Sequence, residues 1–215
     1  MAGQEAPIVW IDLEMTGLDL EKDAIVEIAV VVTDGNLQPL DAGLNLIVKP
    51  PQSAVDGMND FVRRMHTTTG LIEKWDTGLD LAEAEKQSLD YIRRFVKEPK
   101  KAPLGGNSVG TDRSFLARYM PELTDFLHYR IIDVSSIKEL AKRWYPRVYF
   151  AAPEKTGNHQ ALGDIYDSID ELRYYRSALF PAGDGPESGV AKKIAKQIKA
   201  DLTEQRALEA HRQTK

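Results

Sequence analysis

Apolar residues form three dense runs within the first fifty residues of the chain. The runs cover residues 8–14, 24–33 and 40–48, and the turn-forming residues 33–36 (TDGN) separate the second run from the third. Runs of Ile, Val and Leu that end at turn residues are typical of buried β-strands. The pattern therefore predicts three strands that are partly antiparallel.

The apolar positions change to helical spacing after residue 79. In residues 79–96 they recur every three or four residues and Pro99 follows, which predicts an amphipathic helix. The later segments expected are a short apolar stretch at 102–104, a helix at 112–120, a strand at 129–134, and helices at 135–144 and 159–179. This order predicts an α/β domain with a mixed β-sheet and helices on both faces.

The end of the chain has a different composition. Residues 181–189 (PAGDGPESG) are rich in Pro and Gly, as linkers often are. Residues 190–215 carry seven Lys or Arg and three acidic residues, a local charge of +4. We expect a domain over residues 1–180, a linker over 181–189, and a charged C-terminal tail over 190–215 that is helical or disordered. A solvated helix and a weak RNA-binding or partner-binding arm both fit the tail.

Composition narrows the possible functions. The 215 residues, 42% of them hydrophobic, suffice for one domain with a sizeable core. A net charge of −5 argues against a broad cationic surface for long duplex nucleic acid. No apolar run reaches the roughly 18 residues of a membrane helix and no secretory signal is visible, so no membrane association and a cytoplasmic location are expected. Because the chain has no cysteine, a metal site would use oxygen or imidazole ligands.

Two acidic residues stand at alternate positions where the first apolar run ends. In a strand, Asp12 and Glu14 project from the same face, together with Trp10. Adjacent carboxylates repel and raise each other's pKa unless a cation joins them. Mg²⁺ and Mn²⁺ prefer oxygen ligands. The pair indicates either a divalent-cation site or an exposed acidic strand end.

Further polar residues extend this picture. Asp112 lies at an expected helix start, where the helix dipole favours an anion, although an ordinary cap or first-turn acid is the alternative. The preceding glycines of residues 105–110 lack the Lys-Ser/Thr of a nucleotide triphosphate loop. His159 at the entrance of the last helix suits a general base, and Asp164 should point inward one turn later. The alternatives are a cap-region or solvated histidine for His159 and an ordinary helix acid for Asp164. Gly163 is expected to allow a close backbone approach.

Together these motifs resemble those of the DEDDh 3′–5′ exonuclease superfamily, which has D-x-E on a first strand, an Asp opening a middle helix and H-x4-D in a late helix. The segments that carry the resemblance are WIDLEMTGLD, GNSVGTDRSFL, HYRIIDVSSIKELAKRW and HQALGDIYDSIDELRYYR. They are most similar to the branch that acts on very short RNAs. The resemblance implies an RNase H-like fold, a homodimer, and removal of nucleotides from the 3′ end of single-stranded RNAs of two to about seven nucleotides. Diribonucleotides would be the preferred substrates and 5′-mononucleotides the products.

The same resemblance implies the catalytic roles. Asp12, Glu14 and Asp164 would bind one divalent ion, Mg²⁺ or Mn²⁺. Asp12 would bridge to a second ion, and Asp112 would support the pair directly or through water. His159 would take the proton from the attacking water.

Substrate contacts are implied as well. Leu18 and Phe61 would clamp the bases, although the second position is usually Trp in the superfamily branch. His66 would contact the substrate, with a surface helix histidine as the alternative. The group expected around the substrate's 5′ phosphate comprises Ser108, His128, Tyr129, Arg130 and Ser135. Its HYR segment would come from the neighbouring subunit, and a closed cap of this kind would explain a preference for short substrates.

Other functions are compatible with parts of the pattern. A DNA-proofreading or RNA-trimming member of the superfamily would share the five catalytic residues. The chain could also be a non-catalytic nucleotide-binding module or a structural dimerisation protein. In either case, the three motifs would be present without a catalytic function.

Overall fold

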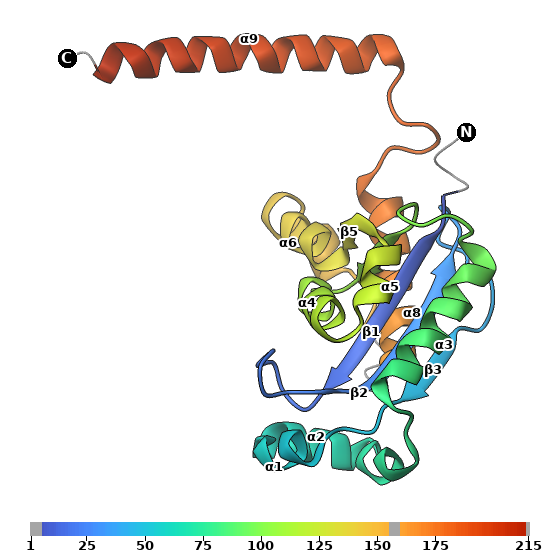
Figure 1. Ribbon diagram of the computed structural model, residues 1–215. Helices are drawn as coiled ribbons and strands as arrows, with labels where there is room; N and C mark the ends of the chain where they lie inside the picture. The colour runs from blue at the N-terminus through green and yellow to red at the C-terminus, as the bar shows by residue number, and fades with distance from the viewer. Residues whose placement is uncertain (1–5, 155–159, 214–215) are drawn as a thin grey trace. The chain divides into compact units, whose positions relative to one another are not determined.

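A five-stranded mixed sheet forms the centre of the computed structural model, which describes residues 6–154 and 160–213. The strands follow the order β3–β2–β1–β4–β5 across the sheet (Figure 1). Their bounds are Ile8–Met15 (β1), Ile25–Thr33 (β2), Leu44–Ile47 (β3), Pro103–Gly106 (β4) and His128–Asp133 (β5). The predicted mixed sheet is confirmed.

Strand directions divide the sheet into two parts. β1 pairs with β2 and β2 with β3 in antiparallel fashion, whereas β4 and β5 run parallel to β1. The β1–β2 register places Glu14 opposite Glu27. The predicted third strand at 40–48 is shorter in the structure, because Gly43 has a φ of 87° and its N–H donates to the Asp41 side chain. This turn delays the start of β3.

Helices follow the strands in the order expected, with several short ones added. Their bounds are Gln52–Gly57 (α1), Asp60–Thr68 (α2), Leu81–Phe95 (α3), Gly110–Tyr119 (α4), Pro121–Phe126 (α5), Val134–Trp144 (α6), Pro146–Phe150 (α7), Ala161–Leu179 (α8) and Ser188–Gln213 (α9), and Ile72–Thr77 is the 3₁₀ helix η1. The sequence pattern did not indicate α1, α2, η1, α5 or α7. None of the helices in the described residues is long and apolar enough to cross a membrane.

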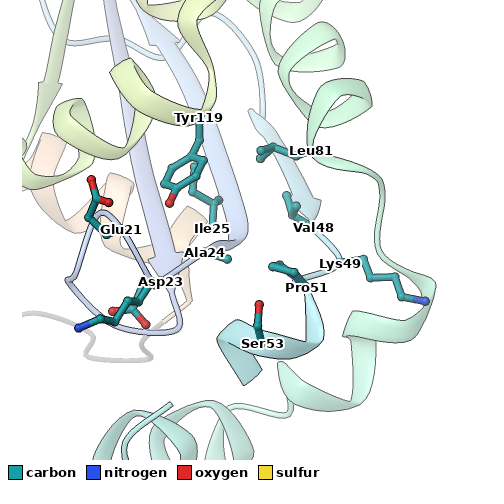
Figure 2. A pocket seen from close by; sticks show the side chains of 11 residues that line it. Glu21, Asp23, Ala24, Ile25, Val48, Lys49, Pro51, Ser53, Leu81 and Tyr119 are labelled. Carbon is teal, nitrogen blue, oxygen red and sulfur yellow. The ribbon is translucent and has the colours of Figure 1, made fainter. Parts of the chain in front are cut away.

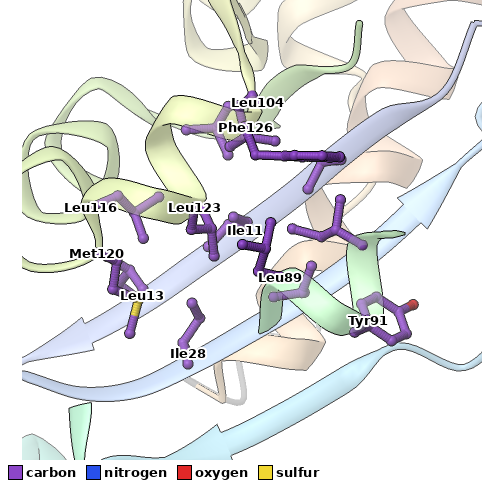
Figure 3. Packing of buried hydrophobic residues seen from close by; sticks show 14 of the residues in the cluster. Ile11, Leu13, Ile28, Leu89, Tyr91, Leu104, Leu116, Met120, Leu123 and Phe126 are labelled. Atoms are coloured by element: carbon purple, nitrogen blue, oxygen red, sulfur yellow. The ribbon is translucent and has the colours of Figure 1, made fainter. Parts of the chain in front are cut away.

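The two faces of the sheet have different covers. The α3, α4 and α5 helices bury one face, where Ile11 and Leu13 of β1 pack with Leu89, Leu116 and Leu123 (Figure 3). The α8 helix lies on the opposite side of the sheet from α3 (Figure 1). Because side chains alternate along a strand, residues 12 and 14 face α8 while residues 11 and 13 face the core. Both predicted layers are present.

Chain contacts define two compact units, which divide between Tyr175 and Arg176. The first contains the sheet, the helices up to α7 and most of α8. The second contains the last residues of α8 and the whole of α9, which begins at Ser188. The boundaries predicted at residues 180 and 189 stay a prediction.

Candidate active site

Three carboxylates from two elements meet at the α8 face of the sheet. Asp12 and Glu14 extend from β1 and Asp164 from the first turn of α8, and each offers an oxygen within 4.8 Å of the others. All three are partly buried. The predicted cluster therefore forms, and Asp164 points inward as expected. The interpretation of Asp12 and Glu14 as a merely exposed strand end is wrong.

Electrostatics make this cluster unstable as three bare negative charges. Burial, followed by repulsion from Asp112 and Glu14, raises the pKa of Asp12 to about 9. Burial, followed by repulsion from Glu27, raises the pKa of Glu14 to about 8. A positive ion would remove this penalty, and a set of ligands made only of carboxylate oxygens suits a hard divalent cation. The residues present therefore fit Mg²⁺ or Mn²⁺.

Asp112 lies beside the cluster and forms a hydrogen bond with β1, the strand that carries Asp12 and Glu14. It is a first-turn acid of α4, as one of the two ordinary interpretations expected; the helix's N-cap is Val109, so the N-cap interpretation is wrong. Its Oδ1 accepts the backbone N–H of Leu13 at 3.1 Å, between the two β1 carboxylates. Burial raises the pKa of Asp112 to about 6. The Asp112 side chain thus holds the backbone that carries Asp12 and Glu14.

Two histidines were predicted to function here. His159 lies outside the described residues. His66, on α2, is only 1% exposed, so its interpretation as a surface helix histidine is wrong. Its Nε2 lies 2.9 Å from the carbonyl oxygen of Met15, and its Nδ1 lies 4.0 Å from Oε2 of Glu14. His66 therefore supports the end of β1 and adjoins the cluster.

Glu27 is a site residue that sequence reasoning missed. It lies opposite Glu14 on β2, is 6% exposed, and accepts a hydrogen bond from Nδ2 of Asn45 at 2.7 Å. The available signal was one acid in an otherwise apolar run, IVEIAVVV. A Cβ at Gly163 would meet nothing within 4 Å, so packing of the described residues does not require glycine there. The close approach of this backbone to the site stays a prediction.

The residues predicted to clamp the bases are both exposed. Leu18 is 73% exposed on the β1–β2 loop, and Phe61 is 70% exposed on α2. Asp23 fixes the loop, because it accepts hydrogen bonds from the Thr16 hydroxyl and the Asp19 N–H, both at 2.8 Å. Gly17 leaves room for this carboxylate, since a Cβ at Gly17 would lie 2.3 Å from Oδ2 of Asp23 and displace it. The loop thus presents Leu18 to solvent from a fixed backbone.

The residues predicted around the 5′ phosphate form two separate groups within one chain. Ser108 and Ser135 meet with their Oγ atoms 3.1 Å apart. His128, Tyr129 and Arg130 form the first half of β5, whereas Ser135 follows its last residue, Asp133. His128 is five residue steps from Asp133, roughly 16 Å at about 3.3 Å per residue, and Arg130 is three steps from it, roughly 10 Å. The structure therefore brings the serines together and leaves the HYR segment apart from them.

A pocket of about 210 Å³ lies behind the β1–β2 loop (Figure 2). Glu21, Asp23 and Lys49 contribute charges of both signs, and Tyr119 closes one side. None of the cluster carboxylates lines it. The pocket is distinct from the candidate active site.

Solved structures show where this fold occurs elsewhere. Escherichia coli Exonuclease I in complex with a dA16 oligonucleotide matches with a TM-score of 0.62 at 14% sequence identity, over 81% of this chain and 42% of that chain. A moderately thermophilic Exonuclease I from Methylocaldum szegediense matches with a TM-score of 0.54 at 17% identity, over 81% and 41%. The chain thus spans about two fifths of these proteins, and the likeness shows the shared fold.

Sequence comparison gives the family. Residues 9–172 match the RNase_T family, described as Exonuclease, which is the class that the fold and the acidic cluster define. An oligoribonuclease of Leifsonia xyli subsp. xyli is 61% identical over 186 residues, covering 86% of this chain and 90% of that protein. Those of Streptomyces griseus (58% identical, 90% and 96% covered) and Cutibacterium acnes (54% identical, 91% and 97% covered) are similar. The chain belongs to the oligoribonuclease family of these exonucleases, which confirms the predicted resemblance.

Proposed function

We propose that the chain hydrolyses short oligoribonucleotides from the 3′ end, diribonucleotides above all, and that it does so in the cytoplasm. The observation that carries the proposal is the meeting of Asp12, Glu14 and Asp164 within 4.8 Å on a fold shared with exonucleases. The relatives that cover nearly the whole chain are oligoribonucleases, which supports short RNA as the substrate class. A cysteine-free chain has no disulfide to lose in a reducing compartment.

The carboxylates would hold the metal. Asp12, Glu14 and Asp164 would bind a divalent cation, Mg²⁺ or Mn²⁺, and Asp112 would support a second one beside Asp12. When bound, such cations stabilise the attacking and leaving oxygens of a phosphodiester hydrolysis. The chain's own contribution is rigidity, because β1 and the hydrogen bond from Leu13 to Asp112 fix the ligands.

His159 is the proposed general base. It would accept the proton of the attacking water at an imidazole nitrogen while the water oxygen bonds to the terminal phosphorus. The bond from that phosphorus to the 3′ oxygen of the preceding nucleotide breaks, and this oxygen takes up a proton. One 5′-mononucleotide leaves, and the remaining chain is shorter by one nucleotide.

Leu18 and Phe61 are the proposed contacts to the bases. Their exposure and their positions on the loop and helix that adjoin the end of β1 support this role. Every base has a π face, so stacking on Phe61 would not depend on sequence. We propose His66 as a substrate contact on the basis of its position beside Glu14.

Ser108 and Ser135 are proposed to bind the substrate's 5′ phosphate, with His128, Tyr129 and Arg130 supplied by a second copy of the chain. The distance between the two groups within one chain supports this arrangement. Exposed apolar side chains on two elements also support it: Tyr129 and Ile131 on the edge strand β5, and Leu140 and Trp144 on α6. Exposed edges and apolar patches are typical of association sites.

A time course with 5′-labelled diribonucleotide and a seven-nucleotide RNA tests the function. We expect cleavage to mononucleotides with Mn²⁺, fastest on the dinucleotide, and none with EDTA or with Asp12→Ala. Asp90→Ala, which changes an exposed carboxylate on α3, serves as the control and should retain activity. Preference for the longer RNA or for DNA would contradict the substrate assignment, and no cleavage of any substrate would contradict the enzyme.

A further inference from the structure

Asn107 joins the β4–α4 loop to two helices through its side-chain amide. Its Nδ2 donates to Oγ of Ser168 at 2.9 Å and to Oε2 of Glu171 at 3.1 Å, both on α8. Its Oδ1 accepts from Oγ of Ser135 at 2.9 Å, at the start of α6. Only an amide combines two donors with an acceptor in this way, so no other type of side chain of this size satisfies all three partners.

The α8 end of this network is firmly held. Glu171 is buried and also forms an ion pair with Nζ of Lys138 at 3.1 Å. The Ser168 hydroxyl donates to the carbonyl oxygen of Asp164 at 2.8 Å. The network therefore begins at the helical turn that carries a cluster carboxylate.

The other end of the network holds the backbone of Ser108, which has an unfavourable conformation. Ser108 has a φ of 51°, a left-handed conformation that residues other than glycine rarely adopt. Its N–H donates to Oγ of Ser135 at 3.0 Å and to Oδ1 of Asp133 at 2.9 Å. The position of Ser108 thus depends on Ser135, and that of Ser135 depends on Asn107.

We propose that Asn107 is a positioning residue that fixes the Ser108 and Ser135 hydroxyls at a set place relative to Asp164. This inference rests on the proposed function, in which the two serines bind the 5′ phosphate and Asp164 belongs to the cleavage site. The continuous path runs from the Asp164 carbonyl through Ser168, Asn107 and Ser135 to Ser108. It sets the spacing between the two ends of the substrate, and so selects its length.

Two substrates separate positioning from general support of the fold. These are a diribonucleotide with a 5′ phosphate and the same dinucleotide with a 5′ hydroxyl. For Asn107→Ala we expect kcat/KM on the phosphorylated dinucleotide to fall by about tenfold or more, mostly through KM, because hydrogen bonds to a charged group are lost. Turnover of the 5′-hydroxyl dinucleotide should change by less than about threefold, because it lacks that group.

Coupling and a matched control sharpen the test. Asn107→Ala combined with Ser135→Ala should cost no more than Ser135→Ala alone, because Asn107 acts through Ser135. Gln87→Ala, which removes a part-buried amide that donates to Glu83 on α3, should change neither substrate. Equal losses on both dinucleotides, or additive losses in the double variant, would overturn the proposal.

Ser168→Ala covers the case in which Asn107→Ala does not fold, because it removes one anchor with little change in volume. A loss confined to the 5′-phosphorylated dinucleotide supports the proposal, and an equal loss or no change overturns it. If the wild-type protein itself does not distinguish the two dinucleotides, the proposed phosphate contact is wrong and the inference falls with it. A different outcome is that the wild-type protein prefers the 5′-phosphorylated dinucleotide and Asn107→Ala keeps the same preference. In that case the phosphate contact stands and only the positioning role of Asn107 is wrong.

Discussion

Asp12 and Glu14 link the stability of the fold to pH. Their pKa values rise to about 9 and about 8, whereas a free Asp or Glu carboxyl group titrates at about pH 4. A carboxyl group with a raised folded pKa binds protons more tightly in the folded chain, so the free energy of unfolding falls as pH rises through this interval. Without divalent cations, we expect the melting temperature to drop by several degrees from about pH 5 to about pH 8 in a scan with EDTA.

Metal should reverse this effect. Mg²⁺ or Mn²⁺ at about a hundred times its Kd adds roughly 2.7 kcal/mol to the free energy of unfolding. Asp12→Asn should weaken both the pH dependence and the response to metal, whereas Asp90→Asn should keep both. An unchanged pH slope in Asp12→Asn would contradict the assignment of this buried charge.

Phe61 allows a test of base stacking at a single side chain. Phe61→Ala should raise KM for the dinucleotide about 5- to 150-fold, since stacking of a base on an aromatic ring contributes about 1–3 kcal/mol. Phe61→Trp enlarges the ring and should lower KM. Steady-state kinetics measure both, with Phe180→Ala as an exposed control in the other unit. If KM for the dinucleotide is the same in the wild-type protein and in Phe61→Ala, the proposed contact between Phe61 and a base is excluded.

The positions of some site residues could be predicted from the sequence, and the positions of others could not. The shared face of Asp12 and Glu14 follows from the two-residue period of a strand, so it was predictable. The helical pattern predicted that Asp164 points inward, but its approach to Asp12 and Glu14 depends on how α8 packs on the sheet, and only the family resemblance indicated that shared site. The burial of His66 depends on a separate cluster that includes Val26 and Trp75 beneath α2, which no local pattern encodes.

At the scale of elements, the β1–β2 loop should tolerate little change at Gly17. An added Cβ at this position displaces the Asp23 carboxylate, and the hydrogen bonds that fix the loop are then lost. We expect Gly17→Ala to lower kcat/KM by about tenfold or more, because small displacements of contact residues are costly in catalysis.

The matched control is Gly57→Ala, where an added Cβ meets nothing within 4 Å and activity should persist. Both variants need a melting curve alongside the kinetics. A fully active Gly17→Ala would show that the fixed loop is not needed to present Leu18.

Long elements were predictable and short ones were not. β2 and α3 extend over 9 and 15 residues, which is enough for a period to be recognised. α1, α5 and α7 have only five or six residues, less than two helical turns. α2 begins with an Asn59 cap that accepts the Val62 N–H, a signal that was present but not used.

At the scale of the whole molecule, the exposed surface of β5 and α6 should mediate association. Trp144→Glu places a charge in this apolar surface and should shift the protein from dimer to monomer in sedimentation velocity. The monomer should also lose its preference for 5′-phosphorylated dinucleotides. Leu40→Glu changes an exposed leucine outside this surface and should leave the oligomeric state unchanged. A monomeric wild-type protein that retains the preference would contradict the proposed dimer.

In the proposed dimer, each active site contains residues of two chains, because Ser108 and Ser135 of one chain would meet the His128–Arg130 segment of the other. Mixing two variants tests this arrangement. Asp12→Asn and Arg130→Ala chains should each be inactive on 5′-phosphorylated dinucleotide as pure dimers. In a mixed dimer, one site combines the intact Asp12 of one chain with the intact Arg130 of the other, and the second site carries both defects. After subunit exchange at equal amounts, about a quarter of the wild-type sites should be restored, because half of the dimers are mixed. Two defective alleles would thus complement each other, which a protein with complete sites in each chain cannot do.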